Sequence, residues 1–217
     1  MKAIRILIAD DHSLIREGLR AVIQAHRGWE LCGEAGNGRQ AVELAKELRP
    51  DVVVLDLTMP ELNGLEATRQ LRATLPRTQI LILTMHDSEA LAQEVLAAGA
   101  RGYVLKNDAP ELLPRAIEAL AAGRMFFTPK VAELVMDSLA KGATPRGEAA
   151  VRSRLTPRER EIVQSLAEGK SNKETADALG ISINTVETHR KNVMSKLRLR
   201  SASDLVRYAI RNHLIQA

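Results

Sequence analysis

The first half of the chain alternates between two kinds of segment, and this alternation constrains the fold more than any other feature. Short apolar runs rich in Val, Ile and Leu are separated by longer amphipathic stretches. Runs this short, without alternating polar residues, are typical of strands buried on both faces. Five such strands separated by helices predict a doubly wound α/β unit with a parallel sheet and right-handed crossovers. The expected strands lie at 4–9, 31–35, 52–55, 80–83 and 103–105.

After residue 122 no further strand is expected and helical patterns take over. Residues 123–150 are interpreted as a linker, with a short helix at 125–139 and an exposed Gly- and Pro-containing stretch at 141–147. From residue 155 onward four short helices are expected, so the predicted parts are an α/β domain (1–122), the linker and a helical domain (151–217). Residues expected to cap helices in the two domains are Ser13, Asp108 (with Glu111), Thr156 (with Glu159), Ser171 (with Glu174), Ser182 and Ser201 (with Asp204).

Charge is distributed unevenly along the chain. Residues 1–122 carry a net charge of −3 and residues 151–217 a net charge of +6, within a total of +4. A basic C-terminal third indicates a polyanionic partner for that part, although a solvated basic surface is an equally good interpretation of charge alone.

Several classes of protein are excluded by composition. A single cysteine, Cys32, rules out an internal disulfide framework and a multi-cysteine metal site, and it is expected to be a small core residue. The apolar run before Asp10 is too short for a signal peptide, and no stretch approaches the roughly 18 apolar residues of a membrane span. A reduced cytoplasmic protein without a membrane segment is therefore expected.

Polar residues follow the predicted strands at the points where the strands end. They are Asp10 and Asp11, Asp56, Thr84 and Lys106. The carboxyl ends of parallel strands share one edge of the sheet, so these side chains should meet there. Three clustered carboxylates repel one another unless a cation joins them, and an all-oxygen set suits Mg²⁺. A carboxylate beside Mg²⁺, with a hydroxyl and an ammonium nearby, is equipped to accept a phosphoryl group; the alternative is a structural salt-bridge cluster around Lys106.

These residues resemble the receiver domain of bacterial two-component response regulators. The resemblance covers residues 1–122 and includes Gly64, Tyr103 three residues before Lys106, and the motif Asp56-Leu57-Thr58-Met59-Pro60. It implies a flavodoxin-like fold and phosphorylation of Asp56 by a sensor histidine kinase. Asn107 departs from the family, in which proline is common after the lysine.

The same resemblance assigns roles to the surrounding residues. Asp11, Asp56 and the Thr58 carbonyl would bind Mg²⁺, with Asp10 acting through water. Thr84 and Lys106 would bind the phosphoryl oxygens. Tyr103 would be the switch aromatic, with Thr84 as its partner, unless it is a plain buried strand residue.

The sequence excludes two other kinds of site that occur in α/β proteins. A flavin site needs a Gly-, Ser- and Thr-rich phosphate loop after the first strand, where Asp10, Asp11 and His12 stand instead. A haloacid-dehalogenase-like phosphatase needs a second carboxylate two residues after its nucleophile, and Thr58 occupies that place. His12 is expected only to precede the Ser13 cap, while His86 and Thr58 are expected to control water access to the site.

The C-terminal domain carries a helix-turn-helix pattern. Ala176, Leu179 and Val186 belong to one apolar face across a turn at Gly180, although a plain helical hairpin has the same pattern. The second helix, expected from residue 183 to 197, would enter the major groove. Its residues off the apolar face suit base edges, and nearby cations suit phosphates: the first set is Glu187, Thr188, Lys191 and Asn192, and the second is Lys173, Arg190 and Lys196.

A wider set of motifs resembles the LuxR-type DNA-binding domain. The matching segments are 155–161, 169–174, 182, 185–189 and 196–197, and they add Thr185 and His189 to the expected DNA-binding residues. Thr175 and Glu187 depart from the family pattern. Together the two domains resemble a response regulator of the NarL/FixJ class, which implies double-stranded DNA with a two-fold site as the partner. An active homodimer through the helix at 201–214 is implied too, unless that helix only packs within the monomer.

The expected function is therefore that of a transcription factor activated by phosphorylation, not of an enzyme. One alternative is a receiver that acts by protein–protein docking, with phosphorylation-independent or vestigial DNA binding. Another is control by dimerisation or a ligand without phosphorylation, which the complete acidic site disfavours.

Overall fold

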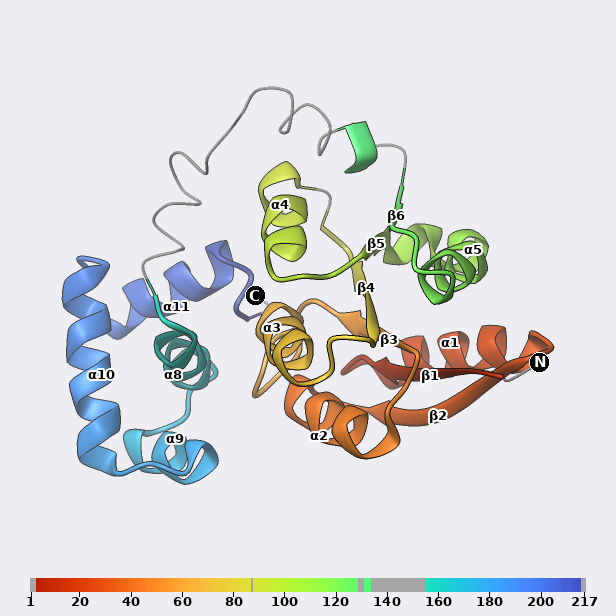
Figure 1. Ribbon diagram of the computed structural model, residues 1–217. Helices are drawn as coiled ribbons and strands as arrows, with labels where there is room; N and C mark the ends of the chain where they lie inside the picture. The colour runs from red at the N-terminus through yellow and green to blue at the C-terminus, as the bar shows by residue number, and fades with distance from the viewer. Residues whose placement is uncertain (1–2, 87, 129–130, 134–154, 216–217) are drawn as a thin grey trace. The chain divides into compact units, whose positions relative to one another are not determined.

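The computed structural model describes residues 3–86, 88–128, 131–133 and 155–215 (Figure 1). These residues form two compact units, one N-terminal and one C-terminal. Most of the predicted linker lies outside the described residues, so its boundaries stay a prediction. None of the described helices has the length and apolarity needed to cross a bilayer.

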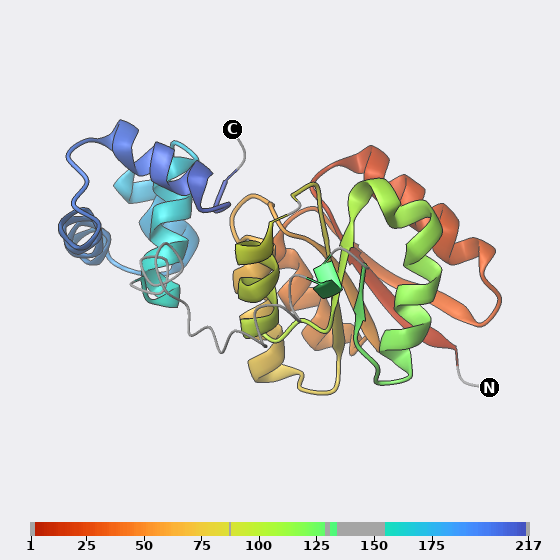
Figure 2. The same cartoon turned by 90° about the horizontal axis from the view of Figure 1, so that it is seen from above.

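The N-terminal unit is a parallel sheet in the order β2-β1-β3-β4-β5-β6. Figure 2 shows α1 and α5 on one face of this sheet and α2, α3 and α4 on the other. The doubly wound α/β class predicted from the sequence is thus confirmed. The elements are β1 (Ile4–Ala9), α1 (Ser13–Ala25), β2 (Trp29–Ala35), α2 (Gly38–Leu48), β3 (Val52–Asp56), α3 (Gly64–Thr74), β4 (Gln79–Thr84), α4 (Glu89–Ala97), β5 (Gly102–Leu105), the 3₁₀ turn η1 (Lys106–Asp108), α5 (Ala109–Ala121) and β6 (Phe126–Phe127).

The sheet has six strands, not the five predicted. The additional strand, β6, pairs in parallel with β5 through the partners Gly102–Phe126 and Tyr103–Phe127. A strand of two residues is too short to give an apolar run in the sequence, and it forms because the chain leaving α5 returns along the free edge of β5. It also replaces the first residues of the helix expected at 125–139; of the rest of that helix, residues 131–133 are helical, and residues 129–130 and 134–139 lie outside the described residues.

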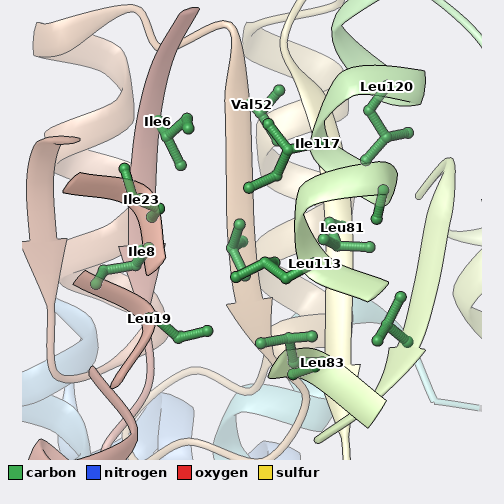
Figure 3. Close-up of a cluster of buried hydrophobic side chains, with 14 residues drawn as sticks. Ile6, Ile8, Leu19, Ile23, Val52, Leu81, Leu83, Leu113, Ile117 and Leu120 are labelled. Atoms are coloured by element: carbon green, nitrogen blue, oxygen red, sulfur yellow. The ribbon is translucent and has the colours of Figure 1, made fainter. Parts of the chain in front are cut away.

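One core of this unit lies between the sheet and the helix pair α1 and α5 (Figure 3). Alternate residues of the central strands, such as Ile6 and Ile8, face these helices and are fully buried. All five residues of β3 are buried, as expected for a strand covered on both faces. The helices contribute Leu19 and Ile23 from α1 and Leu113, Ile117 and Leu120 from α5.

The C-terminal unit consists of α8 (Pro157–Ala167), α9 (Asn172–Leu179), α10 (Ile183–Lys196) and α11 (Ala202–Arg211), as predicted. Its core includes Val163, Val193 and Leu205, and a second cluster joins Ala176 to Val186 across the turn. Gly180 ends α9 with φ 62°, a left-handed conformation that glycine adopts without steric penalty. The predicted caps are confirmed in this unit, with reciprocal capping boxes at Thr156, Ser171 and Ser201 and a side-chain cap at Ser182.

Two caps predicted in the N-terminal unit are wrong. Ser13 is the first residue of α1, and the residue before it, His12, makes no side-chain cap because its ring contacts the acidic cluster. Asp108 makes no side-chain cap either, since it belongs to η1 and has helical backbone angles (φ −95°, ψ −5°) rather than the extended ones of a capping residue.

Candidate functional site

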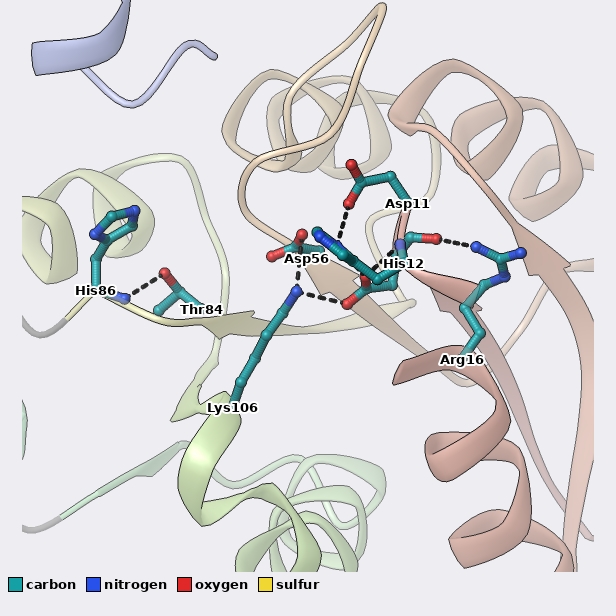
Figure 4. A network of polar contacts seen from close by, with 8 residues as sticks. Asp11, His12, Arg16, Asp56, Thr84, His86 and Lys106 are labelled. Atoms are coloured by element: carbon teal, nitrogen blue, oxygen red, sulfur yellow. Dashed lines mark hydrogen bonds and ion pairs between the residues drawn. The ribbon is translucent and has the colours of Figure 1, made fainter. Parts of the chain in front are cut away.

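The ends of three strands bring a lysine against two buried aspartates. Lys106 Nζ lies 2.7 Å from Asp10 Oδ2 and 2.9 Å from Asp56 Oδ2 (Figure 4). Asp10 follows β1, Asp56 ends β3 and Lys106 follows β5, so residues far apart in sequence meet where the sheet topology predicts. Both aspartates are almost fully buried, at 0% and 3% exposure.

Asp11 and His12 complete an acidic cluster at this edge. His12 Nδ1 lies 2.8 Å from Asp11 Oδ1 and 3.3 Å from Asp10 Oδ1, while the His12 amide donates to Asp10 Oδ1 at 2.9 Å. One ligand atom from each of Asp10, Asp11, His12 and Asp56 falls within 4.8 Å of the others. Three carboxylates against the single ammonium of Lys106 leave excess negative charge, which a divalent cation would neutralise. The donor set therefore fits a hard cation.

Sequence reasoning missed two residues that hold this cluster in place. His12 contacts both neighbouring carboxylates, and its position directly after the aspartate pair was the available signal. Arg16, one turn into α1, donates from its guanidinium to the Asp10 carbonyl at 2.6 Å (Figure 4). Nothing in the spacing of apolar residues distinguishes Arg16 from an ordinary exposed helix residue.

Burial and charge act in opposite directions on Asp56. Loss of water raises the pKa of Asp56 to about 6, and the neighbouring carboxylates of Asp10 and Asp11 add to this rise, whereas Lys106 opposes it. Burial also disfavours the charged form of Lys106, but Asp56 and Asp10 outweigh it and hold the pKa of Lys106 above its ordinary value. The site thus favours the charged form of Lys106 and, without a bound cation, disfavours ionisation of Asp56.

Thr84 and Tyr103 contact the same residue from two strands. The His86 amide donates to Thr84 Oγ1 at 3.0 Å, and the Tyr103 hydroxyl donates to the His86 carbonyl at 2.6 Å. Thr84 and Tyr103 are each 1% exposed. The His86 imidazole points away from the carboxylates in Figure 4, so its predicted control of water access stays a prediction.

Gly64 determines how closely the loop after β3 packs. Its amide donates to the Leu57 carbonyl at 2.7 Å, and a Cβ at this position would lie 2.1 Å from the Asp56 carbonyl oxygen. Any side chain would therefore displace the backbone of Asp56. Thr58, whose carbonyl is the predicted cation ligand, is buried in the same loop.

On α10 the predicted base-reading residues are exposed: Glu187, Thr188, Lys191 and Asn192. The Asn172 side chain connects two residues of this helix to α9, donating to Glu187 Oε1 and accepting from Arg190, both at 3.4 Å. Asn172 was not among the predicted DNA-binding residues. Lys173 is exposed on α9, while Thr185 and His189 are half-buried.

Lys196 has an internal partner. Its Nζ lies 2.8 and 2.9 Å from the two carboxylate oxygens of Glu159, the residue that completes the Thr156 capping box. Burial alone would raise the pKa of Glu159, but Lys196 and the cap of Thr156 outweigh it and lower the pKa below its usual value. Lys196 thus ties α10 to the start of α8.

A parallel sheet with a buried aspartate beside a lysine, joined to a helix-turn-helix unit, defines a phosphorylation-responsive DNA-binding regulator. Residues 6–118 match the model of the response regulator receiver domain, and residues 153–209 match that of bacterial regulatory proteins of the luxR family. The chain therefore belongs to the two-component response regulators, in the NarL/FixJ class of transcriptional regulators.

Similar proteins support this assignment along the whole chain. The transcriptional regulatory protein LiaR of Bacillus subtilis is 40% identical over 98% of this chain and 99% of its own, and MctR of Rhizobium johnstonii is 36% identical over 98% and 95%. A LuxR-family response regulator from Aurantimonas has a TM-score of 0.61 at 40% identity, covering 64% of this chain and 99% of that structure. The response regulator RcsB, solved in complex with DNA, has a TM-score of 0.58 at 28% identity, covering 95% and 98%.

Proposed function

We propose that Asp56 accepts the phosphoryl group by which a sensor histidine kinase controls DNA binding by this chain. The observation that carries the proposal is the contact of Lys106 Nζ with Asp56 Oδ2 at 2.9 Å, at the carboxyl end of β3. The receiver (1–122) and the LuxR-type domain (151–217) would act as separate domains joined by the linker at 123–150. A DNA-binding regulator of this kind would act in the cytoplasm.

Mg²⁺ is the cation that the acidic cluster would hold. Asp11, Asp56 and the Thr58 carbonyl would bind it directly, and Asp10 through water. When bound, Mg²⁺ supplies positive charge that neutralises the carboxylates and the incoming phosphoryl oxygens.

The chain's own residues would carry the transfer. A carboxylate oxygen of Asp56 attacks the phosphorus of the donor's phosphohistidine, so an O–P bond forms as the P–N bond breaks and the imidazole leaves. Lys106, already charged and directed at Asp56, would then pair with a phosphoryl oxygen. Thr84 would donate its hydroxyl to another oxygen, and any movement of Thr84 would reach Tyr103 through His86.

The output would be binding of α10 in the major groove. Glu187, Thr188, Lys191 and Asn192 would contact base edges, and Lys173 and Arg190 would contact phosphates. Thr185 and His189, being half-buried, would approach the DNA from the start and middle of the helix. Lys196 would reach a phosphate only by leaving Glu159.

An active homodimer on a two-fold site is part of the proposal. RcsB dimers bound to DNA have been solved, in a structure 28% identical to this chain with a TM-score of 0.59. Leu205 and Ala209 of α11 are buried in the monomer, where they pack against Val163 and Val193. A dimer contact through α11 would therefore use its remaining face.

Incubation with acetyl phosphate and Mg²⁺ tests the acceptor. One acid-stable, base-labile phosphoryl group should be incorporated, and Asp56→Asn should abolish it because an amide is not a nucleophile here. Asp51→Asn, at the opposite edge of the sheet, is the matched control and should be labelled normally. Undiminished labelling of Asp56→Asn would refute the assignment.

Duplex titration tests the output against the docking-only alternative. Phosphorylated full-length protein should bind DNA with an affinity that falls steeply with salt concentration. A phosphorylated protein that binds no duplex at low salt would favour a receiver that acts by docking alone.

A further inference from the structure

The loops at the opposite edge of the receiver sheet each carry an arginine. These loops join the end of a helix to the start of the next strand, on the side of the unit where the chain begins (Figure 2). Strands β3 to β6 are neighbours in the sheet, and the usual strand spacing of about 4.8 Å places the arginines before them in one row. We call this set the arginine edge: Arg27 before β2, Arg49 before β3, Arg77 before β4, Arg101 before β5 and Arg124 before β6.

Carboxylates do not neutralise the arginine edge. Among the described residues, no ion pair joins any of its five guanidinium groups to an aspartate or glutamate. Asp51 also lies in these loops; its Oδ2 accepts from the Arg5 amide at 2.9 Å, a neutral donor that leaves its negative charge in place. Arg49 and Arg101 each donate to one carbonyl, that of Lys46 and that of Gly123. The five guanidinium groups therefore keep most of their donors, and Asp51 offsets only part of their positive charge.

A cleft of about 580 Å³ opens in the arginine edge. Arg49 and Arg77 line it from two loops, and apolar side chains including Pro50, Pro76 and Leu120 form other parts of its wall. The volume falls within the range of about 300–1,000 Å³ that is typical of small-molecule sites. Gln79 also lines the cleft, and within the described chain its buried Oε1 has no hydrogen-bond partner; as an acceptor, this oxygen would pair with a hydroxyl or amino group of a ligand and not with a phosphate.

We propose that this cleft binds a small molecule that carries two or more phosphate groups, of the nucleotide class. A guanidinium matches the geometry of phosphate oxygens, and two arginines from separate loops suit neighbouring phosphates. The proline and leucine side chains would contact the less polar part of the ligand. A concave site of this size favours a small anion over duplex DNA, whose convex backbone would meet Arg27 and Arg124 rather than the cleft.

The position of the cleft connects it to the phosphoacceptor. Strand β3 begins directly after Asp51, which lines the cleft, and ends at Asp56. Strand β4 begins at Gln79, in the cleft, and ends at Thr84. A ligand would therefore contact the starting ends of the two strands whose other ends carry the proposed phosphoryl chemistry.

Residue-resolved arginine labelling of the full-length chain tests the proposal. Phenylglyoxal modification is followed by peptide mass spectrometry at about 0.15 M salt, without divalent ions, in the presence of ATP, inorganic tripolyphosphate or a short DNA duplex. ATP and tripolyphosphate should each protect Arg49 and Arg77 several-fold. Arg115, exposed on α5 away from this edge, is the internal control and should be modified equally in all samples. Because labelling is read by peptide, anion binding to the basic C-terminal unit is scored separately.

Equilibrium dialysis of ATP gives the second readout. Arg77→Gln should weaken binding at this site by about tenfold, and Arg115→Gln should leave it unchanged. Protection by duplex DNA alone would make the edge a nucleic-acid surface and overturn the proposal. No protection by any probe would mean that the arginines only offset the negative helix C-termini, which would overturn it as well. Acetyl phosphate labelling of Asp56 in Arg77→Gln should stay normal, so failure here is distinguishable from failure of the proposed phosphoacceptor.

Discussion

The Tyr103 hydroxyl donates a hydrogen bond of 2.6 Å to the main-chain carbonyl of His86, two residues beyond Thr84. Because the His86 amide in turn donates to Thr84 Oγ1, the aromatic residue on β5 is connected to the hydroxyl at the end of β4 through one residue of backbone. A displacement of Thr84 toward Asp56 would therefore be expected to move the His86 carbonyl that accepts from the tyrosine.

Tyr103→Phe should separate phosphorylation from its output. The phenyl ring keeps its packing, so labelling by acetyl phosphate should be unchanged, while loss of the bond should lower the stability by about 1 kcal/mol. The gain in DNA affinity on phosphorylation should shrink, as measured by duplex titration with and without phosphodonor. His86→Ala keeps both backbone bonds and should retain the full gain. A full gain in Tyr103→Phe would show that this bond is not part of the switch.

Asp56→Asn should stabilise the protein in the absence of divalent ions. The pKa of Asp56 is raised from 3.8 to about 6, so between these values the folded state binds more protons than the unfolded state, and stability falls as pH rises through this window. The substitution should remove that fall and raise the free energy of unfolding at pH 7 by roughly 1–3 kcal/mol. Urea unfolding of both proteins in EDTA, from pH 4 to pH 7, measures this pH dependence of the free energy of unfolding. The range brackets the ordinary and the raised pKa of Asp56. Parallel pH profiles would contradict the burial of charge at Asp56.

The two aspartates after β1 should differ in their effect on Mg²⁺ binding. Mg²⁺ should raise the Tm of the native protein by ligand linkage. Asp11→Ala, at an exposed position, should blunt this response with little change in the metal-free Tm. Asp10→Ala removes a fully buried partner of Lys106, so it should lower the metal-free Tm but keep more of the response. Equal and full responses in both variants would contradict this division of roles.

Gly64→Ala should destabilise the receiver and slow labelling of Asp56. The new Cβ would lie 2.1 Å from the Asp56 carbonyl oxygen, and the enforced backbone shift should lower stability by about 1–3 kcal/mol. Gly18→Ala is the matched control, because a Cβ there meets nothing within 4 Å and lies on the exposed side of α1. It should raise stability by about 0.5–1 kcal/mol. Thermal unfolding and acetyl phosphate labelling of the two variants test this prediction. Equal stability and equal labelling rates in Gly64→Ala and Gly18→Ala would refute the steric argument.

We expect two kinds of DNA contact: contacts to phosphates, which position the protein on the duplex, and contacts to base edges, which determine sequence specificity. Lys173→Ala should weaken specific and non-specific duplexes alike and reduce the salt slope by about one unit. Glu187→Ala should leave non-specific binding the same or tighter, because it removes a negative charge, and should reduce discrimination at one base pair by roughly 1–3 kcal/mol. Titrations of the full-length protein at several salt concentrations measure both. Equal weakening of both duplexes by Glu187→Ala would show that Glu187 mainly positions Asn172, which it contacts in the structure.

The sequence predicts the acidic site well because the topology of a parallel sheet fixes it. Once β1, β3 and β5 are recognised as parallel strands, Asp10, Asp56 and Lys106 must meet at one edge. The side chains that hold the site in place are harder to predict. Arg16 donates to the main-chain carbonyl of Asp10, and His12 contacts Asp11 through a ring nitrogen, and the spacing of residues along the sequence indicates neither contact. Strand β6 is not predicted for a similar reason: its two residues carry no strand pattern of their own, and they are extended because they pair with β5.

Capping shows the same limit. Thr156, Ser171, Ser182 and Ser201 cap their helices as predicted, because each has extended backbone angles that direct its side chain to the amides of the first turn. Asp108 carries the same local signal, but the tertiary structure places it in a 3₁₀ turn. Which capping motifs form therefore depends on the backbone conformation that the tertiary structure gives to the capping residue itself.

Strand β6 also fixes the point at which the chain leaves the receiver. Phe127 pairs with Tyr103 in the sheet, so the residue that contacts His86 with its hydroxyl holds the outgoing chain with its backbone. A movement of Tyr103 would shift the start of the only covalent path toward the DNA-binding helices. If Asp56 is phosphorylated as proposed, a displacement that reaches Tyr103 would therefore also reach the main chain at Phe127.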